Sequence, residues 1–235
     1  MAAKNLSFKA GVKAGVPIAL GYIPIAITFG LVAKSTGVPD YISIMMSLLV
    51  FAGASQFVAV NLLALSTGHW QIIVTTLIVN LRHFLMSASM AQRIKKNTPK
   101  GLRALLAFGI TDETFSIASL RPENELSFHF VLGLNLVSYS SWVLGTAGGV
   151  FLGMGLPQTL QTSMGIALYA MFIGILVPNL KKSYAILIVS LITVVINTFL
   201  SWTSFFSSIS TGWRVVITTI LASALGSYFF PKEAV

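Results

Sequence analysis

The sequence predicts an all-α polytopic membrane protein, and three observations lead to this fold class. Hydrophobic residues make up 55% of the 235 residues and charged residues only 9%, whereas roughly 25% of the residues in a soluble domain are charged. The mean hydropathy is +0.86. Four long stretches contain no Asp, Glu, Lys or Arg: 14–33, 41–81, 126–180 and 183–213. Because a spanning helix needs about 20 apolar residues, each stretch holds at least one.

The net charge of +9 does not indicate a nucleic-acid-binding protein. The basic residues form short clusters beside apolar segments, the strongest at 93–103, as cytoplasmic loops of membrane proteins do. They are not interleaved with aromatic residues along one face. The chain has no cysteine, which excludes disulfides, thiol catalysis and Cys-ligated metals. We therefore expect no nucleic-acid partner, no metal and no cofactor.

Residues 1–235 are expected to form a single transmembrane domain with eight apolar segments. They run over 14–33, 41–65, 70–91, 103–120, 127–155, 159–179, 183–202 and 212–230. Gly145, Gly149 and Gly153 in the fifth segment form two GxxxG steps, which favour close helix packing. The apolar pattern predicts about six spanning helices plus two broken or re-entrant segments.

An internal repeat is predicted, with halves at 14–120 and 127–230. When the sequence is aligned with itself at an offset of 118 residues, residues 28–39 match residues 146–157. If the second and sixth segments return to the side they entered from, the N-terminus, 93–103 and 181–182 all face the cytoplasm, as the positive-inside rule requires. The two halves then have opposite orientations, as in many secondary transporters. Alternatively, the second segment simply spans the membrane with a kink.

Polar residues in the second segment are candidates for substrate binding. Gly53 allows the backbone to open, while Ser55 and Gln56 offer donors and acceptors in an apolar stretch. A zwitterionic substrate needs such partners once its water is removed, because unpaired polar groups in an apolar medium cost several kcal/mol. The alternative is that these residues only hold helices together.

Charged residues near the middle of two further segments form a second candidate group. Arg82 lies ten residues before Gln92, on the order of 15 Å along a helix, which is too deep to reach the surface comfortably. Asp112 and Glu113 lie about nine residues into the fourth segment. Ionisable residues at such depth are rare and usually mark transport pathways, proton relays or paired charges.

We expect Arg82 to neutralise one of the two carboxylates, which leaves the other carboxylate, or His83, to take up and release a proton. Asn80 lies on the same face of the helix as His83 and would help to shape the substrate site. A purely structural charge pair between the third and fourth segments is the alternative. No serine–histidine–aspartate grouping, phosphate-binding loop or zinc motif is present.

The sequence resembles the AzlC family of branched-chain amino-acid permeases. The resemblance lies in five strings, in order and spacing: GYIPIAITFG at 21–30, FAGASQF at 51–57, NLRH at 80–83, TDETFS at 111–116 and WVLGTAGG at 142–149. It implies the large subunit of an exporter of leucine, isoleucine, valine or similar amino acids, acting with a small AzlD-type membrane subunit. It implies no list of site residues.

The sequence thus predicts a transporter in the cell membrane, with Gly53, Ser55, Gln56 and Asn80 at the substrate and Arg82, His83, Asp112 and Glu113 in charge balance and proton coupling. Three alternatives from other classes remain open at this point. The same residues suit a gated channel for a small polar solute. The chain could also be a non-transporting assembly subunit, or an intramembrane enzyme, for which it lacks a recognisable catalytic group.

Overall fold

The computed structural model describes residues 6–152, 183–203 and 211–231, with single positions at 155, 157, 159, 173, 176, 177, 180, 181, 206 and 209. These described residues contain helices and turns but no strand. Within the described residues, four helices are long and apolar enough to cross a membrane: α2 (Phe8–Ser35), α5 (His69–Arg93), α8 (Phe128–Leu152) and α11 (Tyr184–Trp202). The prediction of an all-α polytopic membrane protein is confirmed.

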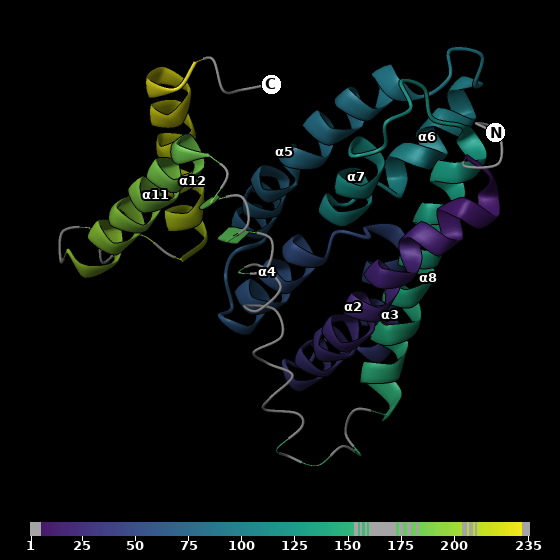
Figure 1. Ribbon diagram of the computed structural model, residues 1–235. Helices are drawn as coiled ribbons and strands as arrows, with labels where there is room; N and C mark the ends of the chain where they lie inside the picture. The colour runs from purple at the N-terminus through teal and green to yellow at the C-terminus, as the bar shows by residue number, and fades with distance from the viewer. Residues whose placement is uncertain are drawn as a thin grey trace. The chain divides into compact units, whose positions relative to one another are not determined.

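The helices belong to two compact units of the chain (Figure 1). The other described helices are α3 (Asp40–Leu49), α4 (Gly53–Ala64), α6 (Lys100–Phe108), α7 (Asp112–Ser119) and α12 (Thr211–Phe229). One unit joins Met1–Val60 with Asn80–Ala167, and the other joins Asn61–Val79 with Leu168–Val235. All the polar residues selected from the sequence lie in the first unit.

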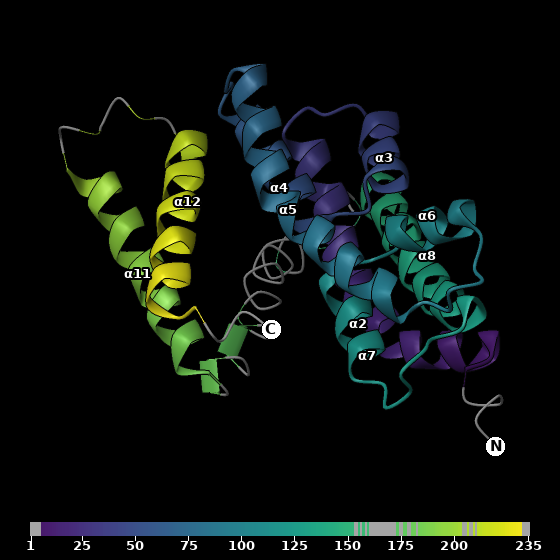
Figure 2. The same cartoon turned by 90° about the horizontal axis from the view of Figure 1, so that it is seen from above.

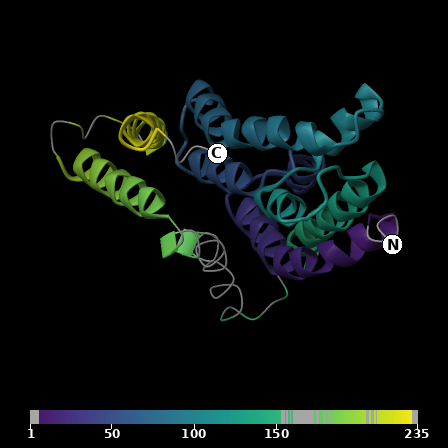
Figure 3. The same ribbon diagram turned by 45° about the horizontal axis from the view of Figure 1, so that its top comes forward.

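Helices α2 and α8 pack side by side in the first unit, as the purple and green ribbons of Figure 3 show. Glycines on their facing sides let the two backbones approach closely. A methyl group added at Gly11 would lie 2.0 Å from the carbonyl oxygen of Phe130, and one at Gly149 would lie 2.1 Å from that of Ile27. The predicted packing role is confirmed for Gly145 and Gly149; Gly153 lies outside the described residues.

The two central helices run in the same direction. Gly11 meets Phe130 near the start of both helices, and Gly30 meets Thr146 further along. At the far end, the ammonium group of Lys34 donates a hydrogen bond to the carbonyl oxygen of Val150, at 2.9 Å. The first and fifth apolar segments are therefore parallel, whereas the predicted inverted repeat requires them to be antiparallel.

The second apolar segment is broken, as expected from the sequence. Helix α3 ends at Leu49 and α4 begins at Gly53. Phe51, between them, has a φ of +46°, in the left-handed region that is uncommon for a residue with a side chain. Its ring is buried and packs edge-on against Tyr22 and Tyr139, which holds the strained backbone in place.

The fourth apolar segment is also broken, although its apolar length predicts one spanning helix. Helix α6 ends at Phe108 and α7 begins at Asp112. The Thr111 hydroxyl accepts a hydrogen bond from the Thr114 N–H, and the Thr114 hydroxyl accepts one from the Thr111 N–H. This reciprocal cap satisfies two N–H groups that a helix start leaves unpaired, so a new helix can begin inside the unit.

Backbone contacts bring three ends of helices to the same side of the first unit. The Leu126 N–H donates to the carbonyl oxygen of Arg93 at 2.7 Å, and the Lys95 N–H donates to that of Leu126 at 3.3 Å. The Ser127 hydroxyl donates to the carbonyl oxygen of Leu6. The starts of α2 and α8 therefore lie beside the end of α5 and the basic loop, on the side that the positive-inside rule assigns to the cytoplasm.

The start of α6 and the end of α7 also lie on this side, because Arg103 donates to the carbonyl oxygen of Lys96 and Arg93 donates to that of Ser119. The two helices therefore form a hairpin, and the positive-inside rule predicts that it opens to the cytoplasm. This corrects the expected opposite directions of the first and fifth segments, because the fourth segment returns instead of crossing. The repeat of 14–120 and 127–230 stays a prediction. The sixth segment, 159–179, which is expected to be re-entrant, lies almost entirely outside the described residues.

Helices α3 and α4 form the opposite hairpin. The start of α3 lies beside the end of α2, where Lys34 and Asp40 form an ion pair, and α4 returns toward Phe29 of α2, whose ring packs against Phe57. This arrangement favours a re-entrant segment over a kinked span. The tips of the two hairpins meet: the ring centroids of Phe51 and Phe108 are 6.5 Å apart, and Tyr139 lies within 5.7 Å of both. Both tips follow the pattern Leu-Leu-x-Phe, at 48–51 and 105–108.

The described part of the second unit contains a helical hairpin of α11 and α12 (Figure 2). A methyl group at Gly226, near the end of α12, would lie 2.8 Å from Cγ2 of Val189, near the start of α11. The two helices therefore run antiparallel. The predicted seventh and eighth segments, 183–202 and 212–230, correspond to these helices.

The corrected topology can be tested with single cysteines, because the chain has none of its own. We expect Asn124→Cys, in an exposed position before α8, to react with a membrane-impermeant maleimide from the cytoplasmic side only. Ser35→Cys, exposed at the end of α2, should react from the outside only. Lys96→Cys is the control, because it is cytoplasmic in both topologies. Labelling of Asn124→Cys from the outside would restore the inverted arrangement of the first and fifth segments.

Candidate functional site

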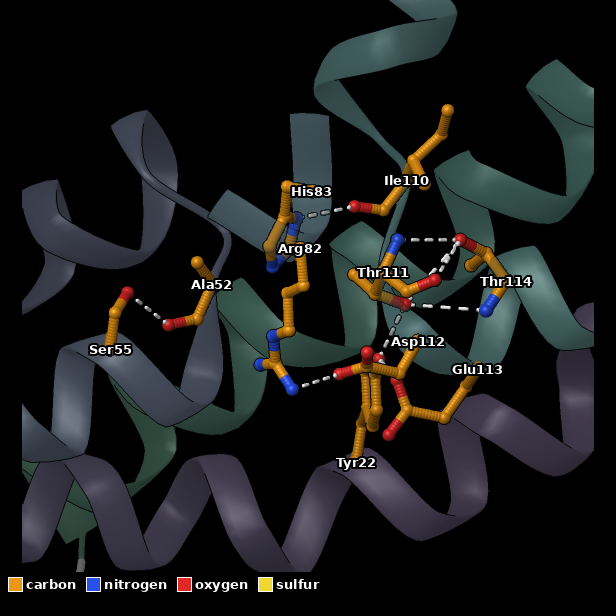
Figure 4. Close-up of polar contacts among 10 residues, drawn as sticks. All are labelled: Tyr22, Ala52, Ser55, Arg82, His83, Ile110, Thr111, Asp112, Glu113 and Thr114. Carbon is orange, nitrogen blue, oxygen red and sulfur yellow. Dashed lines mark hydrogen bonds and ion pairs between the residues drawn. The ribbon is translucent and has the colours of Figure 1, made fainter. Parts of the chain in front are cut away.

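Two of the selected charged residues form an ion pair inside the first unit (Figure 4). Nη1 of Arg82, on α5, lies 2.7 Å from Oδ2 of Asp112, the first residue of α7. The two side chains are 35% and 28% exposed. Because a helix N-terminus carries partial positive charge, the start of α7 also stabilises the Asp112 carboxylate. This is the arrangement expected from the sequence, in which Arg82 balances one of two neighbouring carboxylates.

The second carboxylate, Glu113, has no cation as its partner among the described residues. Its Oε2 accepts a hydrogen bond from the hydroxyl of Tyr22, on α2. The same hydroxyl lies 2.8 Å from Oγ1 of Thr111, the N-cap residue of α7. Among the described residues, the Glu113 side chain is therefore bonded to a phenol instead of a cation, and it lies in the first turn of its own helix.

Three side-chain atoms on one stretch of α5 are buried without a hydrogen-bond partner among the described residues: Asn80 Oδ1, Arg82 Nε and His83 Nε2. The other ring nitrogen of His83, Nδ1, lies 3.0 Å from the carbonyl oxygen of Ile110. A carbonyl can only accept, so Nδ1 carries a proton, and Nε2 of a neutral His83 is an acceptor. Leaving a buried polar atom unpaired costs about 1–3 kcal/mol. This stretch therefore has both donor and acceptor capacity to offer a ligand.

Gln56, in contrast, is fully buried and bonded on both sides of its amide. Its Oε1 accepts from the indole N–H of Trp142 at 3.0 Å and from the Ala52 N–H at 3.3 Å. Its Nε2 donates to the hydroxyl of Ser47 at 3.0 Å, which in turn lies 2.7 Å from Oγ1 of Thr146. Gln56 thus ties the tip of α3–α4 to α8.

Gly53 and Ser55 also make contacts within the hairpin tip. A methyl group at Gly53 would lie 2.7 Å from the Trp142 ring, so the glycine allows this indole to pack against the start of α4. The Ser55 hydroxyl donates to the carbonyl oxygen of Ala52 at 2.9 Å. In this conformation Gly53, Ser55 and Gln56 are engaged in packing, and their role in substrate binding stays a prediction.

Tyr22 connects the two groups of selected residues. Its hydroxyl contacts Thr111 and Glu113 at the start of α7. Its ring centroid lies 6.3 Å from that of Phe51, between α3 and α4, and 5.4 Å from that of Trp142 on α8. When the shared Leu-Leu-x-Phe strings are aligned, Ser55 and Gln56 correspond to Asp112 and Glu113. In this sequence alignment, neutral residues of one hairpin stand opposite carboxylates of the other, although Ser55 is the third residue of α4 and Asp112 is the first residue of α7.

Tyr22 and Thr111 are not among the residues selected from the sequence. One signal could have pointed to Tyr22, since its hydroxyl is the sole hydrogen-bonding side-chain group between Lys13 and Thr28. Thr111 gives no such signal, because its role depends on a helix start that the apolar pattern conceals.

No metal centre is found in the part of the chain that the structure describes. Within it, no three His, Cys, Asp or Glu residues are placed to hold a metal ion. The described side chains of the site form an ion pair and hydrogen bonds, and the roles of Glu113 and His83 in proton coupling stay predictions.

A comparison with protein families identifies the relatives of this chain. The sequence model of the AzlC protein family matches residues 17–156. The chain belongs to the AzlC family. The matched region contains both hairpins, the ion pair, Tyr22 and the unpaired atoms of α5, so the family match covers the whole candidate site.

Individual relatives of this AzlC-family protein are membrane proteins. It is 39% identical to an uncharacterized membrane protein of Archaeoglobus fulgidus over 180 residues, which are 76% of this chain and 78% of the relative. It is 35% identical to the inner membrane protein YgaZ of Escherichia coli, over 77% of each chain. It is 32% identical to the branched-chain amino acid transport protein AzlC of Bacillus subtilis, over 62% of this chain and 58% of that one. No solved structure matches the chain.

The packing of Gly53 against Trp142 can be tested by thermal unfolding in detergent. Gly53→Ala places a methyl group 2.7 Å from the indole, and overpacking of this kind costs about 1–3 kcal/mol. Gly148→Ala is the control, because its methyl group would approach no closer than 3.9 Å to any neighbour. We expect Tm to fall for Gly53→Ala and to be unchanged or raised for Gly148→Ala. Equal effects of the two substitutions would contradict the close contact.

Proposed function

We propose that this AzlC-family protein exports branched-chain or similar apolar amino acids across the membrane, coupled to protons, together with a small AzlD-type membrane subunit. The name of the Bacillus subtilis relative supports the substrate class. The observation that carries the proposal is the meeting of two broken hairpins, from opposite sides, beside a charged cluster with unpaired polar atoms.

A zwitterionic amino acid requires partners of both signs when it leaves water. Arg82 Nε suits its carboxylate, and two acceptors, Asn80 Oδ1 and Nε2 of a neutral His83, suit its ammonium group. Discontinuous helices are typical of substrate sites in secondary transporters, because half-helix N-termini attract anionic groups. Both α4 and α7 begin near Tyr22, so either helix start can contribute backbone N–H groups to the carboxylate.

The charge balance of the cluster supports proton coupling. Arg82 is neutralised by Asp112, so an ionised Glu113 adds one net negative charge at a depth where unbalanced charge is costly. Uptake of a proton by Glu113 removes that charge. If Glu113 binds a proton from one side of the membrane and releases it to the other, its change of charge would favour the opening of first one hairpin and then the other.

The hairpins supply the two gates that alternating access needs. In this arrangement α3–α4 closes the path from the outside and α6–α7 closes it from the cytoplasm. The substrate-binding role of Gly53, Ser55 and Gln56 fits here as a part of the outer gate, where their contacts with Trp142 change when the tip moves. The alternative functions of channel and assembly subunit predict no uphill flux.

Flux of labelled leucine from proteoliposomes tests the proposal. The protein is reconstituted with the small subunit, and the pH is made lower on the side that receives leucine. We expect uphill movement of leucine that collapses when a protonophore removes the pH gradient. Leucine movement only down its own gradient would indicate a channel, and no movement with the subunit present would indicate an assembly role. Full uphill flux without the subunit would contradict the proposed partner.

Substitution of the carboxylates tests their separate roles. Glu113→Gln should reduce gradient-driven flux at least about tenfold, the effect of ~1.4 kcal/mol on a barrier, but retain leucine exchange. Asp112→Asn should reduce both, because it leaves Arg82 without its ion-pair partner. Glu125→Gln, at an exposed position before α8, removes the same charge outside the cluster and serves as the control. Unchanged pH dependence in both cluster variants would favour the purely structural charge pair.

A further inference from the structure

The hydroxyl of Tyr22 faces two acceptors at once, although it has only one proton to donate. It lies 2.8 Å from Oγ1 of Thr111 and also within hydrogen-bond distance of Oε2 of Glu113. The Tyr22 side chain is buried, with 6% of the residue exposed. A phenol can donate one hydrogen bond and accept others, so the direction of each bond depends on which neighbour carries a proton.

The charge of Glu113 decides between two arrangements of these hydrogen bonds. An ionised Glu113 can only accept, so the Tyr22 proton points to Oε2 and forms a charge-assisted hydrogen bond. A protonated Glu113 becomes a donor, so it donates to the Tyr22 oxygen, and the Tyr22 proton turns to Oγ1 of Thr111. No atom is transferred between Tyr22 and its neighbours; only hydroxyl rotation reverses the bonds.

Thr111 carries this change to the tip of the α6–α7 hairpin. Its hydroxyl caps α7 by accepting from the Thr114 N–H at 3.3 Å. Its own proton has acceptors in Oγ1 of Thr114, at 3.4 Å, and in the Tyr22 oxygen. When the Tyr22 proton turns to Thr111, the second of these acceptors is lost. The cap that starts α7 therefore differs between the two charge states of Glu113.

The ring of Tyr22 contacts the tip of the α3–α4 hairpin and the tryptophan behind it. It packs edge-on against Phe51, the strained residue of that tip, and against Trp142. Trp142 in turn donates to Gln56 and packs on Gly53. Tyr22 thus contacts both tips, by its hydroxyl on one side and by its ring on the other.

We propose that Tyr22 is a positioning residue that couples the charge of Glu113 to the positions of both hairpin tips. The inference rests on the proposed transport function, in which the tips are the gates. The charged groups that face Tyr22 are Glu113 and Asp112 from α7 and Arg82 from α5 (Figure 4). The described residues of α3, α4 and α8 place no Asp, Glu, Lys or Arg against it, so Glu113 is the group whose protonation reverses its bonds.

Tyr22→Phe separates the two halves of this role, because it keeps the ring and removes the hydroxyl. In proteoliposomes, we expect the rate of leucine exchange to stay within about twofold of wild type. The pH profile of gradient-driven flux should shift by about one pH unit or flatten, because a tenfold change in a protonation equilibrium corresponds to one pH unit. The double variant Tyr22→Phe with Glu113→Gln should behave as Glu113→Gln alone, since residues that act through one another are not additive.

Tyr139→Phe is the matched control. Tyr139 is also an aromatic hydroxyl at the hairpin tips; it packs against Phe51 and donates to the carbonyl oxygen of Leu48 at 2.8 Å. It has no carboxylate partner. Loss of the Tyr139 hydroxyl should change the rate of transport without shifting its pH profile. If Tyr22→Phe retains the wild-type pH profile, or Tyr139→Phe shifts it equally, the proposed coupling through Tyr22 is wrong.

A readout without substrate separates this inference from the transport function. Trp142 is 2% exposed, whereas the other tryptophans, Trp70, Trp202 and Trp213, are 79%, 86% and 45% exposed. Replacing these three with phenylalanine leaves Trp142 as the fluorescent reporter beside Tyr22. We expect its emission to change with pH, and the change to be absent after Tyr22→Phe or Glu113→Gln but present after Tyr139→Phe.

The outcomes are distinguishable. If the wild type moves no amino acid but Trp142 emission follows this pattern, the transport proposal fails and the coupling stands. If the wild type transports and the emission change survives Tyr22→Phe, the coupling fails and the transport proposal stands. An emission that does not respond to pH in the wild-type background also overturns the coupling.

Discussion

Broken backbone at membrane depth is stable only where neighbouring side chains satisfy the polar groups that the break sets free. In this protein those side chains project from the parallel pair α2 and α8. Asn135 donates to the carbonyl oxygen of Leu106 on α6, and Tyr139 donates to that of Leu48 on α3. Trp142 holds the side chain of Gln56, and Tyr22 holds the start of α7. Both hairpins therefore depend on one pair of helices, and glycine contacts such as Gly11 against Phe130 keep that pair close.

This arrangement gives the unit a closely packed helix pair and two hairpins held against it. The α2–α8 pair is joined by close glycine contacts along its length, most of them with backbone atoms of the facing helix. Each hairpin is attached to this pair through hydrogen bonds and aromatic contacts near its tip, and α3 also packs against α2 and α8. Such contacts can be exchanged at modest cost, since a polar contact between membrane helices averages about 0.6 kcal/mol. The charged cluster lies at the attachment of one hairpin, so a change in its charge acts where that hairpin is held.

At the candidate site, the length of an apolar segment gives a wrong prediction of where a helix begins. Residues 103–120 are apolar enough to suggest one helix, and Asp112 and Glu113 then appear in its middle. The structure instead starts α7 at Asp112, behind the Thr111 cap. The two carboxylates gain the favourable field of a helix N-terminus, and this lowers the cost of placing charge in the unit. The cap could not be identified from the sequence, because threonine is common inside apolar helices as well as before them.

The sequence by itself determined the class of protein, the broken second segment and the pairing of Arg82 with a nearby carboxylate. These follow from local quantities: the length of charge-free stretches, a glycine beside polar residues, and charges too deep to remain alone. Only the tertiary structure decided that the fourth segment returns, that α8 runs parallel to α2, and that Tyr22 joins the two hairpins. The physical reason is that each of these depends on contacts between residues about 90 to 120 positions apart, such as Tyr22 with Thr111 and Gly11 with Phe130. Apolar periodicity contains no information on which distant partner will satisfy a broken helix.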